Sequence, residues 1–507
     1  MKGGSLVVEL AQRLAGKVVI SAELTDNDIS GMGIESLTAH TLSFFGDSEG
    51  IHILDKPSLL MIIDRQSTEK APVQIAVLQK KDFNPLAKEI KADYKIRKIE
   101  AEKTPATVED FSSHFRDRFR KLKEILERGS RGSLGVVSSI ESIKQYANGR
   151  EIGAVGIVYD KITTKKGHIL ITLEDEGSTA KVLFLKPERT SRKESQQLFE
   201  SAQRIVNDEV IAIRGRISSP FVIANSIISP DIPVHQPIKT EEEMAIAFTS
   251  DIHVGSKLFM ERHFVKFIEW LNGNVEARRD IAERIKYLVI SGDLVDGIGV
   301  YPNQDRELNI LDIYKQYSVL FDYLESVPDH IEVFLLAGNH DAVQRAEPQP
   351  PLTKDLLGDF KKHNIHILSS PSYVMLHGIK VLAYHGTSLD SIIQAIPGCS
   401  YAKPETAMLE VLKKRHISPI YGENPIVPNK SDSLVIDEVP DILHMGHIHK
   451  NGYAEYHGTQ IINSGAWQSR TQSQIKRGQF PTPAVLPVYE TNTGRILSLD
   501  FTSERMI

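Results

Sequence analysis

The sequence predicts a multidomain α/β protein, on the strength of three observations. The chain has 507 residues, which is more than one domain usually holds. Five short β-like runs lie between residues 150 and 230, and strand-like and helical segments alternate after residue 236, as they do in an α/β sandwich. We therefore expect four parts: a small, mostly helical module (1–63), a flexible linker (64–110), a basic helix with a β-barrel (111–235) and an α/β domain (236–507).

The composition excludes several classes of protein. Hydrophobic residues make up 41% and charged residues 25% of the chain, as in ordinary globular proteins. The net charge of −6 argues against binding nucleic acid by overall charge, so any such contact needs a local patch or bound metals. Cys399 is the only cysteine, which excludes an internal disulfide and fits a reducing cytoplasm. No apolar run approaches the ~20 residues of a membrane span, so we expect a cytoplasmic protein without membrane association.

The N-terminal module has the pattern of a few short elements. Residues 5–15 and 34–45 have helical periodicity, and residues 18–20 have the pattern of a strand between them. A minor domain without a catalytic role is the favoured interpretation, and a docking element for a partner protein is the alternative. Lys, Glu, Gln and Pro then dominate residues 64–109, which favours a flexible linker.

A basic amphipathic helix is expected at residues 111–129. Apolar side chains recur at helical spacing from Phe111 to Leu126, and Gly129 gives a C-terminal stop. The opposite surface carries six basic side chains: Arg116, Arg118, Arg120, Lys121, Lys123 and Arg128. A solvated face over a docked apolar stripe is the favoured interpretation, and a patch that contacts phosphates is the alternative.

The five β-like runs that follow predict a closed barrel. They are residues 154–159, 168–174, 180–185, 209–216 and 221–228. A helical segment at 193–206 separates the third run from the fourth, which is the layout of an OB-fold. Such barrels often bind single-stranded nucleic acid through aromatic side chains, which are sparse here. A scaffolding barrel that binds protein is therefore favoured over direct strand binding.

In the last part, five polar turns each follow a short apolar run. They are Asp251-Ile252-His253, Gly292-Asp293 with Asp296, Gly338-Asn339-His340, His385-Gly386 and His447-Ile448-His449. A buried strand followed by a tight turn places polar side chains at the carboxyl edge of a sheet. We expect all five turns to converge on one place.

The residue types at these turns predict a metal centre. The seven candidate ligands are Asp251, His253, Asp293, Asn339, His385, His447 and His449. This mixture of oxygen and imidazole donors suits manganese, iron or zinc, with magnesium also possible. Seven ligands are too many for one ion and about right for two, and Asp293 is the expected bridge because its carboxylate has two oxygens. We expect two divalent ions, with manganese favoured.

The order of these motifs resembles that of the calcineurin-like metallophosphoesterase superfamily. Four longer stretches resemble the small subunit of archaeal family D DNA polymerases: 292–303 (GDLVDGIGVYPN), 338–350 (GNHDAVQRAEPQP), 421–449 and 463–483. The resemblance extends from about Phe111 to the C-terminus. It implies a calcineurin-like α/β sandwich after the OB-fold, and an OB-fold that helps to join two polymerase subunits.

The resemblance also implies roles for the site residues. One ion would take Asp251, His253, Asp293 and His449, and the other would take Asp293, Asn339, His385 and His447. His340 would face the substrate as proton donor, and Asp296 would hold His340 in the right tautomer. A cap on the turn that follows is the alternative role for Asp296. Asp341 is expected to be a turn residue.

The implied function is the manganese-dependent 3′–5′ exonuclease of a replicative polymerase. The substrate would be a single-stranded or mispaired DNA 3′ end, and the partner would be a large catalytic subunit. A phosphomonoesterase or nucleotidase on the same scaffold is one alternative. A non-catalytic accessory subunit is another, although every ligand position is filled here. The remaining histidines, His444 among them, are expected to be structural, and Gln468 is equally compatible with a structural turn and a subunit contact.

Overall fold

The computed structural model describes residues 83–97, 99, 107–129, 137–188 and 190–506, with short pieces of the N-terminal segment (6–14, 18–20, 25, 37–38, 41–42, 52–54 and 59). In those pieces, helix α1 (Leu6–Arg13) and strand β1 (Val18–Ile20) agree with the predicted helix and strand, and β1 pairs parallel with β2 (His52–Leu54), which was not predicted. Most of the second predicted helix, at 34–45, lies outside the described residues. The rest of the predicted linker, at residues 64–82, 98 and 100–106, lies outside the described residues.

Residues 83–97 differ from the flexible linker that the sequence predicts. They form the short helix α5 (Leu86–Glu89) and strand β3 (Tyr94–Arg97), which pairs antiparallel with β13 (Ser372–Leu376). Tyr94 and Ile96 pack into the core of the α/β domain, while the Lys and Arg of the strand remain exposed. A strand of two apolar and two basic residues is too short to stand out from a polar segment by periodicity.

Helix α6 (Val108–Gly129) begins and ends close to the predicted bounds and joins two parts of the chain. Its later apolar residues, Phe119, Leu122 and Leu126, pack against the barrel, whereas Phe111 and Phe115 pack against the α/β domain. Its predicted basic surface requires one correction, because Arg118 is only 1% exposed.

The barrel has the five strands that the sequence predicts. They are β4 (Glu151–Thr163), β5 (Ile169–Glu174), β6 (Thr179–Phe184), β7 (Val210–Ser218) and β8 (Phe221–Ile228). Their order around the closed barrel is β4-β5-β6-β8-β7, with helix α8 (Lys193–Gln203) between β6 and β7 and the short α7 (Ile140–Ile143) before β4. Alternate side chains of β5 are buried, so the interior is packed by aliphatic residues.

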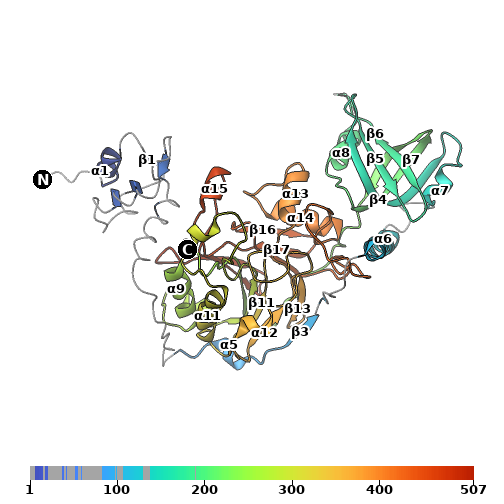
Figure 1. The fold of residues 1–507 in the computed structure, drawn as a ribbon. Coiled ribbons are helices and arrows are strands. Elements are labelled where there is room, and N and C mark those ends of the chain that lie inside the picture. Colours follow the sequence, from blue (N-terminus) through green and yellow to red (C-terminus); the bar gives the residue numbers. More distant parts are fainter. Residues whose placement is uncertain are drawn as a thin grey trace.

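The α/β domain is built on two six-stranded sheets that lie face to face (Figure 1). The first has the order β12-β11-β10-β9-β18-β19 and the second β16-β17-β15-β14-β13-β3. The bounds of the first sheet are β9 (Ala245–Thr249), β10 (Ile285–Ser291), β11 (Glu332–Leu336), β12 (Ile365–Leu368), β18 (Val485–Glu490) and β19 (Ile496–Asp500). The second adds β14 (Ile379–Ala383), β15 (Ile442–Met445), β16 (Gly452–Tyr456) and β17 (Thr459–Asn463).

Helices cover the outer face of each sheet. The first sheet is covered by α9 (Glu261–Leu271), α10 (Arg279–Ala282) and α11 (Ile313–Glu325), and α12 (Lys354–Leu357) lies beside α11. The second sheet is covered by α13 (Leu389–Ala395) and α14 (Glu405–Lys414). Helix α10 is only four residues long, and strand β10 begins soon after it at Ile285. Among the described residues, no helix is both long enough and apolar enough to cross a membrane.

Candidate metal centre

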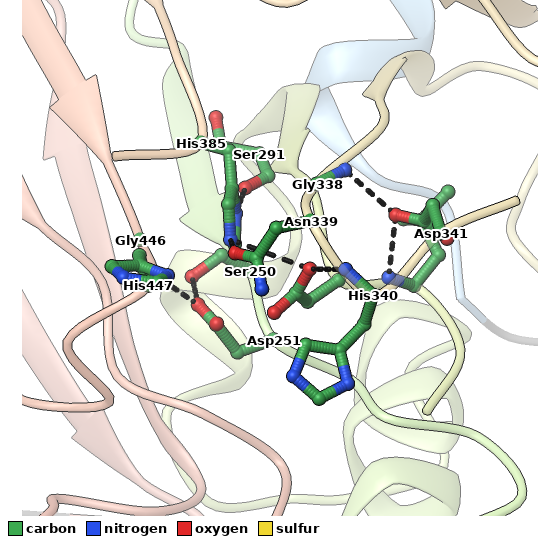
Figure 2. Close-up of polar contacts among 12 residues, drawn as sticks. Ser250, Asp251, Ser291, Gly338, Asn339, His340, Asp341, His385, Gly446 and His447 are labelled. Atoms are coloured by element: carbon green, nitrogen blue, oxygen red, sulfur yellow. Dashed lines mark hydrogen bonds and ion pairs between the residues drawn. The ribbon is translucent and has the colours of Figure 1, made fainter. Parts of the chain in front are cut away.

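All five polar turns meet at one end of the two sheets. Strands β9, β10 and β11 are parallel neighbours in the first sheet, and β14 and β15 are parallel neighbours in the second. Because parallel strands end at the same edge, the turns that follow them lie together. Figure 2 shows the side chains of Asp251, Asn339, His385 and His447 pointing toward one another from four separate turns.

The backbone at these turns is strained. Five of the seven predicted ligands have a positive φ between 49° and 69°: Asp251, His253, Asp293, His447 and His449. Residues other than glycine adopt this conformation at a cost of ~1–3 kcal/mol each, and they cluster at functional sites. The neighbouring glycines allow close approach, since a Cβ on Gly338 would lie 2.3 Å from Asp293 Oδ1.

The first group of donors contains Asp251, His253 and His449, which are placed so that they could hold one ion. His449 Nε2 lies 3.1 Å from His253 Nε2 and 3.3 Å from Asp251 Oδ1. Donor atoms that bind one ion at ~2.1 Å lie about 3.0–3.4 Å from one another, so these separations suit a shared ion. Asp251 Oδ1 is buried and accepts no hydrogen bond from the described residues, which also fits a ligand oxygen.

The second group contains Asp293, His385 and His447, with Asn339 beside them. His385 Nε2 lies 2.9 Å from Asn339 Oδ1 and 3.3 Å from Asp293 Oδ1. The other oxygen of the same carboxylate, Asp293 Oδ2, lies 3.8 Å from His253 Nε2 in the first group. Asp293 therefore presents one oxygen to each group, as a bridging ligand would.

Hydrogen bonds fix the tautomers of two of these imidazoles. His385 Nδ1 donates to the carbonyl oxygen of Ser291 at 2.8 Å, so Nε2 is the nitrogen that is left to ligate an ion. His253 Nδ1 lies 3.0 Å from Asp296 Oδ1, with the same result. In metal proteins such contacts orient the ligating nitrogen toward the ion.

The position of Asp296 corrects the role that the resemblance implied for its side chain. Its carboxylate contacts His253 and not His340. The backbone carbonyl of Asp296 accepts the hydrogen bond from His340 Nδ1 instead, at 2.8 Å. Sequence spacing places Asp296 near both rings but does not show which atom reaches which ring.

Three residues at this site are new or better defined in the structure. Asp390, on α13, places its Oδ2 3.0 Å from His447 Nε2. It lies outside every motif in the sequence, so the sequence carries no signal for this contact. Gln468 donates to Asp296 Oδ1 at 3.0 Å, so it supports the centre from a neighbouring turn. Asp341 accepts backbone hydrogen bonds from Gly338 and Leu294, as expected for a turn residue.

His444 illustrates how a buried histidine differs from a ligand. Its two ring nitrogens lie 2.9 Å from Ser291 Oγ and 3.0 Å from Ser464 Oγ. Burial lowers the pKa of His444 to about 3, so the ring stays neutral. It is therefore a core residue, as the sequence predicts.

The electrostatics of the centre favour a cationic occupant. Burial disfavours a charged imidazole, but Asp293 and Asp251 outweigh it and raise the pKa of His385 to about 10. Buried carboxylates thus draw positive charge into the site. At His340 the same effect of burial dominates, so the pKa of that ring is lowered even though Asp293 is close.

A cleft of about 510 Å³ opens beside the centre. His253, His340, His447 and His449 form its inner wall, and a segment at 471–479 forms part of its rim. The donors therefore face a space that a polymeric or small substrate can enter.

Comparison with known proteins places the chain in a family. The family model of the DNA polymerase alpha/epsilon B-subunit matches residues 246–453. The DNA polymerase II small subunit of Pyrococcus furiosus is 36% identical, over 97% of this chain and 84% of its own length. That of Methanocaldococcus jannaschii is 40% identical over 75% of this chain, and the match spans 64% of that protein.

A solved structure of an archaeal phosphodiesterase matches 50% of this chain and 99% of its own, with 16% identity and a TM-score of 0.27. The identity to the Pyrococcus protein extends over nearly the whole chain. This chain therefore belongs to the small subunits of archaeal family D DNA polymerases, which the names of its relatives call DNA polymerase II.

Proposed function

We propose that this chain is the 3′–5′ exonuclease of a replicative DNA polymerase and that it acts on single-stranded or mispaired DNA 3′ ends. Domain 236–507 would be a calcineurin-like phosphodiesterase, and the barrel within 111–235 an OB-fold. The observation that carries the proposal is the carboxylate of Asp293, which presents one oxygen to each group of donors. A bridging carboxylate between two such groups is what a two-metal phosphodiesterase requires.

The residues divide into two ligand sets. Asp251, His253, Asp293 and His449 would hold one ion, and Asp293, Asn339, His385 and His447 would hold the other. Two divalent ions bound there supply Lewis-acid activation of water and neutralise charge on a phosphoryl group. Manganese suits the donors best, and iron, zinc or magnesium would also fit the mixed oxygen and nitrogen set.

His340 would act on the substrate and not on the ions. Its Nδ1 is occupied by the carbonyl oxygen of Asp296, so Nε2 is the nitrogen left to contact a substrate. Because burial lowers the pKa of His340, the ring is neutral until an anionic phosphate stabilises its protonated form. The protonated ring would then donate to the leaving oxygen of the terminal phosphodiester.

Replacing His340 by Ala is expected to lower turnover by ~10²–10⁴-fold while bound metal stays near the wild-type amount. Hydrolysis of a 3′-labelled single-stranded oligonucleotide with Mn²⁺ and elemental analysis of the same samples would measure both. The exposed His363 offers a matched control, His363→Ala, which should leave both unchanged. Full turnover in H340A would remove His340 from the mechanism.

Replacing Asp390 by Asn is expected to weaken binding of one of the two ions by ~10–100-fold, the usual effect of losing a group that orients a ligand. Asn keeps the size of the side chain but removes the charge that holds His447. Calorimetric titration with Mn²⁺ should show one unchanged and one weakened site. Two unchanged sites would mean that Asp390 does not position His447.

The same metal centre could in principle serve a phosphomonoesterase, so substrate class needs its own test. Wild-type protein is offered single-stranded DNA and p-nitrophenyl phosphate side by side with Mn²⁺. Release of nucleoside 5′-monophosphates from DNA is the expected result. Activity on the monoester alone would reverse the proposal, and no activity on either would favour a scaffolding subunit.

The proposed partner is the large catalytic subunit of the polymerase. The ground for it is that the relatives are named as small subunits. Helix α6 and the barrel would contribute to the contact with that subunit. The barrel has few aromatic side chains that could stack on bases, and Tyr159 is its largest exposed aromatic residue in the described part, which favours binding of protein over binding of a DNA strand. Co-purification with a large subunit tests this assignment.

A further inference from the structure

One side of the cleft is built by a segment that the metal chemistry does not use. Helix α15 (Gln472–Lys476) begins with a capping box, in which Thr471 Oγ1 accepts from the Gln474 backbone and the Gln474 side chain accepts from the Thr471 backbone. The box fixes the start of this short helix. Its end carries two adjacent cations, Lys476 and Arg477, which are exposed and line the cleft.

These two cations are available to a ligand. Burial raises the pKa of the Asp390 carboxyl, and His447, Tyr401 and, to a smaller extent, Arg477 lower it below its usual value, so Arg477 lies near that carboxylate. Neither Lys476 nor Arg477 forms an ion pair within the part of the chain that the structure describes. On a chain with a net charge of −6, an unpaired pair of cations on the rim of the cleft is a local site for anions.

Two tyrosines line the same cleft. Tyr301 donates to Glu307 Oε2 at 2.9 Å, and its ring centroid lies 6.2 Å from that of His340. Tyr401 hydrogen-bonds to Asp390, the carboxylate that contacts His447. Because both hydroxyls are already bound, the rings are held in place beside the two histidines, and aromatic rings of this kind stack on nucleobases.

We propose that the 471–479 segment and these tyrosines form the subsite that holds the strand whose 3′ end enters the metal centre. Lys476 and Arg477 contact backbone phosphates, and Tyr301 and Tyr401 contact the terminal nucleotide. Figure 1 shows α15 and α13 on the same side of the α/β domain, with α12 at the opposite end. This assignment rests on the proposed nuclease function and names where its DNA strand lies.

The test compares two double variants of the full chain that lose the same charge. Lys476→Ala with Arg477→Ala removes the proposed contacts, and Lys354→Ala with Lys361→Ala removes two exposed lysines around α12. Binding of a fluorescent single-stranded oligonucleotide with a 3′ hydroxyl is measured by anisotropy, with Ca²⁺ in place of Mn²⁺ to suppress hydrolysis. The measurement is repeated at several salt concentrations.

The K476A/R477A variant is expected to bind the oligonucleotide about 25-fold more weakly at 0.1 M salt. The slope of log affinity against log salt concentration should become shallower by ~1.4, because each lost phosphate contact to single-stranded DNA contributes ~0.7. The control pair should stay within about twofold of wild type. Hydrolysis of bis-p-nitrophenyl phosphate with Mn²⁺, a small diester that does not reach the rim, should be unchanged in both.

Equal DNA binding by the two pairs would overturn the subsite. So would an equal loss of small-diester and DNA hydrolysis in K476A/R477A, because that pattern means a disturbed metal centre. Failure of the nuclease proposal looks different: wild-type protein would then hydrolyse neither DNA nor the small diester, whatever its affinity for the oligonucleotide.

Discussion

Asp293→Asn is expected to abolish 3′-end hydrolysis, with a loss of at least ~10³-fold, equivalent to about 4 kcal/mol of transition-state stabilisation. Asp293 is the residue whose two oxygens reach the imidazoles of both donor groups. Asn has a similar shape but offers a single, neutral oxygen. It can therefore serve one ion at most, and the second site should lose most of its affinity.

Two measurements on the same D293N sample check this result. Elemental analysis after dialysis should fall from two ions per chain toward one or none, and hydrolysis of DNA with Mn²⁺ should fall to background. A thermal unfolding curve close to that of wild type shows that the fold survives. If D293N retained two ions and normal turnover, the bridging role would be wrong, and with it the division of the ligands.

Asp432→Ala is expected to destabilise the protein by ~3–5 kcal/mol, the usual cost of leaving a buried charge without its partner. Asp432 Oδ2 lies 2.7 Å from Arg118 Nε, and His114 and His416 contact the same oxygen. Arg118 and Asp432 are 1% and 0% exposed at their side chains, so water cannot replace the lost carboxylate. The melting temperature should fall by roughly 6–20 °C.

An exposed pair provides the control for this effect. Arg97 and Asp437 also form an ion pair at 2.7 Å, but their side chains are 46% and 40% exposed. Asp437→Ala should therefore cost less than about 1 kcal/mol. Equal effects of D432A and D437A on thermal unfolding would show that Arg118 finds another partner when Asp432 is lost.

The sequence predicted which polar side chains come together at the edge of the sheets because the signal for each of them is local. Each ligand follows an apolar run by a few residues, so the strand, the turn and the donor appear together in one short stretch. The convergence of the turns then follows from the parallel order of the strands. The barrel could be predicted for a similar reason, because five spaced β-like runs and one helix define its layout without any knowledge of long-range contacts.

The features that could not be predicted from the sequence depend on residues that are distant from each other in the chain. Arg118 looks like any other basic residue of an amphipathic helix until Asp432, 314 residues away, is placed beside it. Asp390 lies in the first turn of a helix, a common place for an acid, and its contact with His447 leaves no trace in the sequence. The contact of the Asp296 side chain with His253, in place of the expected His340, likewise follows from the geometry of the turns and not from spacing.

Strand β3 has a consequence for how the polypeptide is assembled. It is synthesised before the barrel, yet its neighbour β13 is synthesised after the barrel, so the ribosome must release most of the chain before the second sheet can close. The barrel can fold before β3 pairs with β13. If the chain were cut between β3 and α6, the downstream part would expose the unpaired edge of β13, and another chain could pair with that edge.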